Sequence, residues 1–367
     1  NPPFAASAMD GYAARAGDLA GGRPVTLKVI GEAGAGHPFV GRVESGECVR
    51  IFTGAPVPQG ADCIVIQENV KRDEDGTHIQ VVADAPVTKG LFVRPAGRDF
   101  AEDDRILEAG RRIGPQELAL LGAADVATLT VRRKPRVALL SNGDELVEPG
   151  ARRGPGQIPA SNAIALKNLI EEHGGHADDL GIARDTVESL QDLARQAVGY
   201  DLVVTIGGAS VGDRDLVQTA LAPMGLNVDF WRIAMRPGKP LIFGRLGETP
   251  LLGLPGNPVS SLVCGFLFVL PAVRAMLGMP SPAPPRLKAR LGEPTDGNGA
   301  RQAYLRAALS VDCDGTLTAT PLREQDSAYL SPLAAADALI VRPPGAPPAA
   351  TGDLVPIHLL RPIGDSR

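Results

Sequence analysis

Aromatic residues, basic clusters and paired cysteines are all scarce in this sequence. Only 4% of its 367 residues are aromatic, and Trp231 is its single tryptophan. Together with 43 glycines and 33 prolines, this favours many turns and short strands over a helical bundle. The net charge of −5 is spread without a basic tail or stripe, so nucleic acid is not an expected partner.

The cysteines and histidines do not suggest a metal centre or a disulfide framework. The four cysteines are far apart and form no CxxC pair, so reduced structural thiols are expected. His173 and His176 flank two glycines, which are expected to end a helix there and not to position a metal-binding pair. The cysteines are Cys48, Cys63, Cys264 and Cys313.

Long apolar runs are also missing. The longest, at 262–273, is shorter than the roughly 18–20 residues that cross a bilayer, and it contains Gly265 and Pro271. The sequence begins at Asn1 and shows no recognisable signal peptide. We therefore expect no membrane association and a cytoplasmic location.

The chain is too long for a single core at roughly 100–200 residues per domain, and its pattern separates four zones. Residues 1–100 hold short β-rich runs between glycine and proline turns, which predict a β-domain. Residues 101–133 form a connector or elongated arm with one helix at 115–122. Residues 283–367, beyond a proline-rich linker, predict a small β-barrel or sandwich. Predicted strands in the two β-zones lie at 25–30, 47–52, 62–67, 78–82, 286–291, 304–311, 317–320, 338–341 and 354–360.

The remaining zone, 134–282, alternates strands and helices. This order predicts a doubly wound parallel sheet, giving the chain an α/β plus β fold class. In such sheets ligands bind at the carboxyl ends of the strands, so the polar motifs found there are candidates for a site. Predicted strands lie at 136–140, up to 182, 201–206, 228–233, 241–243 and 251–254, and helices at 161–173, from 186, at 215–221 and after 257.

A glycine-rich motif follows the strand 201–206. Gly207 and Gly208 allow close backbone approach to an anionic or planar ligand, and the next helix start offers free N–H groups. Ser210 adds a hydroxyl, while Asp213 and Asp215 place carboxylates beside the pocket, where Mg²⁺ could bridge them to a phosphate. A glycine turn with helix-capping aspartates is the alternative.

A second motif, LPGNPVSS, follows the strand 251–254. Asn257 fits an N-cap and Pro258 the first helical position, so a rigid helix start is aimed at the sheet edge with Ser260 nearby. Such a start is suited to an oxyanion. Ordinary helix initiation is the alternative.

Two further strand ends carry charges. In RPGKP, Arg236 and Lys239 stand in a proline-stiffened turn and could balance a tetrahedral oxyanion, although solvated surface charge is the usual outcome. Glu145 follows the strand 136–140. Asp185 could cap the next helix or bind a metal, and the spacing favours a cap. In the N-terminal zone composition gives Asp10 and Asp99 no chemistry, and both would be surface acids.

Taken together, the chain resembles the molybdopterin molybdenumtransferase family, which includes MoeA and the gephyrin E-domain. SAMDGYA, RIFTGAPVPQGAD, RPAGRD, NGDEL, GGASVGDRD, RPGKP and GLPGNPVSS follow one another in the family's order. The resemblance implies an enzyme that inserts molybdate into adenylylated molybdopterin, releases AMP and requires Mg²⁺ or another divalent cation. It also implies a homodimer whose active site lies between the α/β domain of one subunit and the N-terminal β-domain of the other, and possible contact with the molybdopterin adenylyltransferase.

The resemblance also assigns roles to residues. It implies catalytic acids, of which all but Asp185 are metal ligands, and a set of substrate-binding residues in which Arg236, Lys239 and Ser260 contact molybdate or phosphate. The catalytic acids are Asp10, Asp99, Glu145, Asp185 and Asp215. The substrate-binding residues are Thr53, Ser161, Asn162, Gly207, Gly208, Ser210, Asp213, Arg236, Lys239, Pro255, Gly256, Asn257, Pro258 and Ser260.

Some positions depart from the family's pattern. Asn142 stands where a threonine is usual, Pro159-Ala160 where an aromatic residue is usual, and Ala209 where valine is common. A helical segment that precedes SAMDGYA in the family is not included in this sequence, which is expected to affect how the domains pack. These departures bear on substrate contacts and not on the class.

Two other functions compete with molybdenum insertion. Adenylylation of molybdopterin with ATP is carried out by relatives that share only the α/β domain, so the two β-zones and SAMDGYA argue against it. A noncatalytic dimeric scaffold, like gephyrin's related domain, is the other. Retention of Asp10, Asp99, Glu145 and Asp215 argues against lost catalysis.

Overall fold

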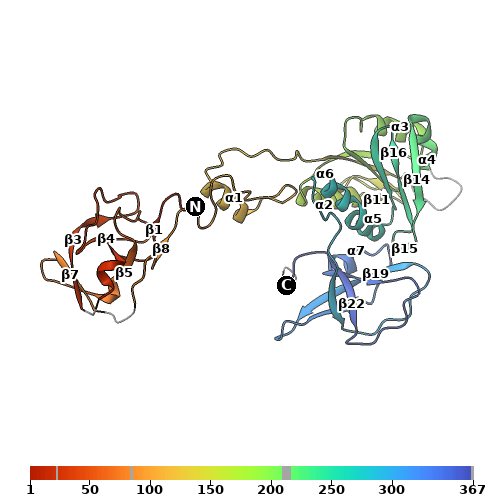
Figure 1. Ribbon diagram of the computed structural model, residues 1–367. Coiled ribbons are helices and arrows are strands. Elements are labelled where there is room, and N and C mark those ends of the chain that lie inside the picture. Colours follow the sequence, from red (N-terminus) through yellow and green to blue (C-terminus); the bar gives the residue numbers. More distant parts are fainter. Residues whose placement is uncertain (22–23, 83–85, 209–215, 365–367) are drawn as a thin grey trace. The chain divides into compact units, whose positions relative to one another are not determined.

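The computed structural model describes residues 1–21, 24–82, 86–208 and 216–364. They divide into two compact units, Asn1–Leu129 and Thr130–Arg367, each of which is described by itself (Figure 1). Ser210, Asp213 and Asp215, which the sequence placed in a substrate or metal site, lie outside the described residues.

The first unit contains a six-stranded sheet in the order β5-β2-β4-β3-β7-β6 and a two-stranded ribbon, β1-β8. The four strands predicted here, β3, β4, β5 and β7, are confirmed. The prediction missed β2, although it lies between β4 and β5 and is fully buried, with Tyr12 and Ala13 in different cores. The strands are β1 Ala6–Ser7, β2 Gly11–Ala14, β3 Val25–Ala33, β4 Glu47–Ile51, β5 Cys63–Ile66, β6 Val70–Arg72, β7 His78–Val81 and β8 Val93–Arg94.

One α-helix follows this sheet in the first unit. It is α1, Pro115–Ala123, and Pro115 occupies its first turn as predicted, where no backbone donor is lost. The Glu117 carboxylate accepts a hydrogen bond from the Gly114 N–H at 2.9 Å and another from Arg111 Nε at 2.7 Å. These bonds fix the entry of the chain into the helix.

The central sheet of the second unit is mostly parallel, as the predicted doubly wound parallel sheet requires, but it contains one antiparallel strand that was not expected. In the order β12-β9-β13-β17-β16-β14, the first four strands are parallel, whereas β16 is antiparallel to both neighbours. Leu246 and Thr249 pair across the two residues Gly247 and Glu248, and Gly247 has a φ of +59°. Such a two-residue connection makes a hairpin. The strands are β9 Arg136–Asn142, β12 His176–Ala183, β13 Leu202–Ile206, β14 Leu226–Arg232, β16 Pro240–Leu246 and β17 Thr249–Leu254.

Helices cover both faces of this sheet, which confirms the doubly wound arrangement (Figure 1). Val137 and Leu139 of β9 lie in one core with residues of α2, α5 and α6, while the alternating Ala138 and Leu140 lie in a second core with α3 and α4. The helices are α2 Asn162–Glu172, α3 Val187–Arg195, α4 Leu216–Leu221, α5 Pro258–Cys264 and α6 Leu270–Met276.

The helix after Asn257 is longer and more apolar than the sequence run suggested. A π-helical turn, Gly265–Val269, joins α5 to α6, so that Pro258–Met276 forms one helix of 19 residues, long and apolar enough to cross a membrane. Half of its most apolar stretch is buried inside the protein. Val263 and Val273 belong to the larger core, so this helix packs as the core helix of a folded domain.

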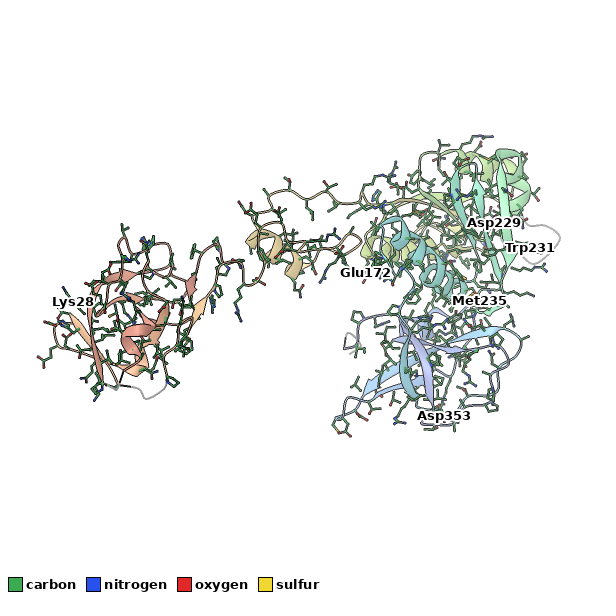
Figure 2. The ribbon with its side chains drawn as sticks, in the orientation of Figure 1. Lys28, Glu172, Asp229, Trp231, Met235 and Asp353 are labelled. Atoms are coloured by element: carbon green, nitrogen blue, oxygen red, sulfur yellow. The ribbon has the colours of Figure 1, made fainter. Side chains whose placement is uncertain are left out.

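The C-terminal part forms a closed five-stranded barrel, in agreement with the prediction. The order β19-β20-β18-β22-β21 closes because β19 also pairs with β21. Strand β15, Met235–Arg236, pairs with β19 and links the α/β domain to the barrel, where Figure 2 labels Met235. Tyr304 and Leu339 of the barrel belong to the same core as α5 and α6. The remaining elements are β18 Leu287–Leu291, β19 Gln302–Val311, β20 Leu317–Pro321, α7 Leu330–Ala334, β21 Ala338–Arg342, and β22 Leu354–Leu359.

Candidate functional site

A cavity of about 680 Å³ lies in the second unit at the carboxyl ends of β9, β13 and β17, where the sequence predicted a site. The last residues of β9 and β13, Asn142 and Ile206, both line it. Ten of the predicted site residues also line it: Glu145, Ser161, Asn162, Asp185, Gly207, Gly208, Pro255, Gly256, Asn257 and Pro258.

The glycine turn brings three strand ends together. Gly207 and Gly208 have φ values of +88° and +69°, the left-handed region that favours glycine. A Cβ atom on Gly207 would lie 2.5 Å from the Asn142 carbonyl oxygen. The Gly207 N–H donates to the Leu254 carbonyl at 3.0 Å. Only glycine therefore permits β9 and β17 to close against this turn.

A polar network joins the loops after β9 and β12. Asn142 Nδ2 donates to Asp185 Oδ1 at 2.7 Å, and the Asp144 N–H donates to Asp185 Oδ2 at 3.3 Å. The reciprocal bond runs from the Asp185 N–H to Asp144 Oδ1, also at 3.3 Å. Thr186 caps α3 by accepting from the Ser189 N–H at 3.2 Å, so the preference for Asp185 as the cap was wrong. The Asp185 carboxylate instead sits at the cavity, with exposed Glu145 also lining it.

The start of α5 is held by a loop of the barrel. Asn257 occupies the predicted N-cap position, but its side chain makes no cap bond and Nδ2 donates instead to Ser327 Oγ at 3.1 Å. The Val259 N–H donates to the Ser327 carbonyl at 3.1 Å. One backbone N–H group at the start of α5 is therefore already hydrogen-bonded within the protein and is not free to bind a ligand. Ser260 is buried in the same turn and is not among the lining residues.

Two side chains support this helix start from further away. Asn162 Nδ2 donates to the Gly256 carbonyl at 2.8 Å, which ties α2 to the loop before α5. The preceding residue, Ser161, occupies the N-cap position of α2 without a side-chain cap bond, and it lines the cavity as predicted for a site residue. Buried Arg306 donates to the carbonyls of Asp326 and Glu324 at 2.9 Å each and so fixes the loop that carries Ser327.

The predicted cationic turn lies at the same sheet edge but outside the cavity lining. Arg236, the last residue of β15, and Lys239 are both exposed in the connection between β14 and β16. Because β14 and β17 both run antiparallel to β16, their carboxyl ends lie at the same edge of the sheet. The connection follows the carboxyl end of β14 and therefore begins at that edge. Only Pro240, the next residue, lines the cavity. Oxyanion binding by the two cations stays a prediction.

Three predicted residues belong to the first unit. Asp10 Oδ1 accepts hydrogen bonds from the Thr53 N–H at 2.7 Å and from its hydroxyl at 2.8 Å. These bonds, first the backbone one, lower the pKa of Asp10 below its ordinary value. Asp99 is exposed, and its N–H donates to the Asn1 carbonyl at 2.9 Å. Thr53 thus holds the Asp10 carboxylate through two hydrogen bonds.

Sequence reasoning missed part of the cavity wall. Asn142 and Pro159 were noted only as departures from the family's pattern. Ile158, which with Pro159 forms β11 and pairs with β10, Leu146–Val147, gave no chemical signal. Ala328 lines the cavity from the loop after β20. Its position depends on the packing of the barrel against α5, which no local pattern encodes.

Among the described residues, no three His, Cys, Asp or Glu side chains group as a metal site. His173 ends α2 as predicted, with Nδ1 2.9 Å from the Leu169 carbonyl oxygen. His176 Nε2 lies 3.3 Å from Asp178 Oδ1. All four cysteines are unpaired, and three of them are buried.

Comparison with known families accounts for this architecture. The model of the MoeA N-terminal region (domains I and II) matches residues 1–124, that of a probable molybdopterin binding domain matches 138–275, and that of the MoeA C-terminal region (domain IV) matches 288–360. The fold and its cavity therefore belong to a multidomain enzyme of molybdenum cofactor biosynthesis.

Individual relatives agree over most of the chain. Molybdopterin molybdenumtransferase of Haemophilus influenzae is 40% identical over 76% of this chain and 67% of its own length. Molybdopterin molybdenumtransferase 2 of Mycobacterium tuberculosis is 35% identical over 96% of this chain and 87% of its own. The structure of a MoeA molybdopterin biosynthesis protein from Pyrococcus horikoshii matches with a TM-score of 0.81 at 34% identity, covering 98% of this chain and 88% of that one. The chain belongs to the molybdopterin molybdenumtransferase family and is a transferase of molybdenum cofactor biosynthesis.

Proposed function

We propose that this enzyme inserts molybdate into adenylylated molybdopterin and releases AMP. The observation that carries the proposal is the cavity at three strand ends, where a glycine turn, a proline-stiffened helix start and two carboxylates meet. Glycines without a Cβ admit a planar or phosphate-bearing ligand close to the backbone. The substrate class comes from the names of the relatives. The cavity is suited to that class because its lining can bind a planar ligand that carries phosphate.

The reaction needs one phosphoanhydride bond to break. Attack by water at the adenylate phosphorus cleaves the bond to the molybdopterin phosphate and releases AMP directly, whereas attack by a molybdate oxygen first gives a mixed anhydride of AMP and molybdate, which water then cleaves to AMP and molybdate. Insertion itself forms two Mo–S bonds to the dithiolene, and two molybdate oxygens leave as hydroxide when they take up the protons of the two thiols. The turn at Gly207 and Gly208 and the start of α5 orient the substrate. Arg236, Lys239 and Ser260 are the residues we assign to the incoming oxyanion. Ser210 and Asp213 complete the proposed substrate contacts.

A divalent cation fits the residues of this site if the phosphates of the substrate provide part of its ligands. Mg²⁺ is commonly held by one or two carboxylates together with substrate phosphates, and it keeps several waters. Glu145 provides a carboxylate of this kind at the cavity, whereas the described residues offer no protein-only cage. When bound, Mg²⁺ would neutralise and polarise the phosphoanhydride. We assign its ligands to Glu145, Asp215, Asp10 and Asp99.

The proposal includes a homodimer in the cytoplasm. Asp10, Thr53 and Asp99 belong to the N-terminal unit, and in the family this unit completes the site of a second subunit. Delivery of the substrate by the molybdopterin adenylyltransferase is the proposed partnership. Size measurement in solution tests the dimer.

Release of AMP from adenylylated molybdopterin with Mg²⁺, measured with and without molybdate, tests the function. Molybdate-dependent release supports insertion, consumption of ATP would indicate adenylylation, and no release from a folded protein would favour a scaffold. Glu145→Gln should lower the rate by about 100-fold or more. Glu148→Gln, three residues along in an exposed position outside the cavity lining, is the matched control and should leave the rate unchanged.

A further inference from the structure

Asn142 is an almost fully buried polar side chain in the wall of the cavity. It is the last residue of β9, pairs with Ala183 of β12, and is only 4% exposed. This register brings its amide to the loop two residues beyond Ala183, where Nδ2 lies 2.7 Å from Asp185 Oδ1. Both residues line the cavity, but the Asp185 side chain is exposed and Asn142 is not.

The chemistry of the pair fixes which way the amide points. A carboxylate only accepts hydrogen bonds, so the NH₂ group of Asn142 must face Asp185 and the carbonyl oxygen must turn away. That oxygen, Oδ1, is buried and makes no hydrogen bond to any described residue. A buried acceptor without a partner destabilises a fold. An apolar side chain of the same shape would avoid this penalty, so the benefit of asparagine here lies in the bond to Asp185.

The remaining bonds of Asp185 hold it less firmly. Among the bonds of the described residues, Oδ2 accepts one, from the Asp144 N–H at 3.3 Å, which is a long bond on an exposed loop. The bond from Asn142 is short and comes from a side chain anchored in the central sheet. Among the described residues it is therefore Asn142 that fixes the direction of this carboxylate.

We propose that Asn142 is a positioning residue that holds the Asp185 carboxylate toward the cavity in the orientation used by the reaction. The inference rests on the proposed function, because it assumes that Asp185 acts on the bound substrate. A displaced carboxylate would bind and react less well even though the strand and the cavity remain.

A cycle of three variants tests this role through activity. Asn142→Leu keeps the shape and removes the donor, and should lower kcat for molybdate-dependent AMP release by about 10- to 100-fold. The KM for molybdate should change little. Asp185→Asn should lower kcat at least as much, and adding Asn142→Leu to it should have no further effect, because residues that act as a unit are not additive. Asn168→Leu, an exposed amide on α2 outside the cavity lining, is the control.

An exchange variant separates positioning from mere stabilisation. Asn142→Asp with Asp185→Asn rebuilds the hydrogen bond with donor and acceptor reversed. The melting temperature should recover relative to Asn142→Asp, whereas kcat should stay low, since the carboxylate is now at the wrong position. If the pair were only structural, both would recover.

Three results would overturn the proposal: an unchanged kcat in Asn142→Leu, additive losses in the cycle, or restored activity in the exchange variant. If the unmodified enzyme released no AMP with molybdate, the proposed function would fail by itself. The melting temperatures of the same variants would then still decide whether the two side chains are coupled, and additive changes would refute the pairing.

Discussion

Replacing Gly207 with alanine should disturb the floor of the cavity in a way that can be calculated. The residue has a φ of +88°, and for any side chain this left-handed conformation costs about 1–2 kcal/mol. The added Cβ would also lie 2.5 Å from the Asn142 carbonyl oxygen, a backbone atom of a central strand that cannot swing aside. Overpacking of this kind costs a further ~1–3 kcal/mol. The expected loss of unfolding free energy is therefore about 2–5 kcal/mol.

Thermal unfolding measures this loss, and Gly199 offers a matched control. Gly199 has a similar φ of +86°, but nothing lies within 4 Å of a Cβ built on it. Gly199→Ala thus isolates the backbone contribution of about 1–2 kcal/mol. For a unit of this size each 1 kcal/mol shifts the melting temperature by about 2–4 °C, so we expect a loss of roughly 4–20 °C for Gly207→Ala and 2–8 °C for Gly199→Ala. Equal losses in the two variants would refute the argument that the close approach to Asn142 requires glycine.

Three other predictions follow from single contacts. Thr53→Val removes the hydroxyl bond to Asp10 but keeps the backbone one, so the pKa of Asp10 should rise partway toward its ordinary value; an unchanged NMR titration would contradict this. Burial lowers the pKa of His358 below its ordinary value of about 6.5. The unfolded chain therefore takes up the proton first, so unfolding free energy should fall as pH drops below about 6.5, and His358→Phe should weaken this dependence in denaturant titrations at several pH values. Gly265→Ala would place a Cβ 2.3 Å from Leu166 Cδ2, and should destabilise the packing of α2 on the long helix by about 1–3 kcal/mol; a variant with unaltered stability would show that Leu166 can move aside.

Much of the second unit could be predicted because its strands are marked by local pattern. RVALL, DLVVTI and PLLGL are mainly apolar runs, the last two followed directly by glycine or proline, and their carboxyl ends meet at the cavity as expected. The antiparallel direction of β16 was missed although its signal was present, since Gly247 and Glu248 leave only two residues between β16 and β17. That spacing allows a hairpin and excludes a crossover.

Other features could not be read from local pattern because they depend on distant segments. The strand at Gly11–Ala14 has only four residues, a glycine, Tyr12 and two alanines, and it becomes an internal strand because β4 and β5 pair with it on either side. Asn257 looked like a cap for its own helix, but Ser327, 70 residues further on, takes its side chain. The partnership of Asn142 with Asp185 likewise appears only when the register of β9 and β12 is known.

The long apolar helix has a consequence for the order in which this protein is made. Its covering side chains include Tyr304, Leu339 and Val341 of the barrel, all of which leave the ribosome after Pro258–Met276. At about 5–20 residues per second, the interval between Met276 and Val341 lasts roughly 3–13 s. During that interval the nascent chain contains a helix with the length and composition of a membrane anchor. The barrel side chains that pack against this helix have not yet all been synthesised. The barrel is thus needed to bury this helix during synthesis as well as to complete the site of the folded protein. We expect ribosome-bound chains that end before Tyr304 to recruit chaperones.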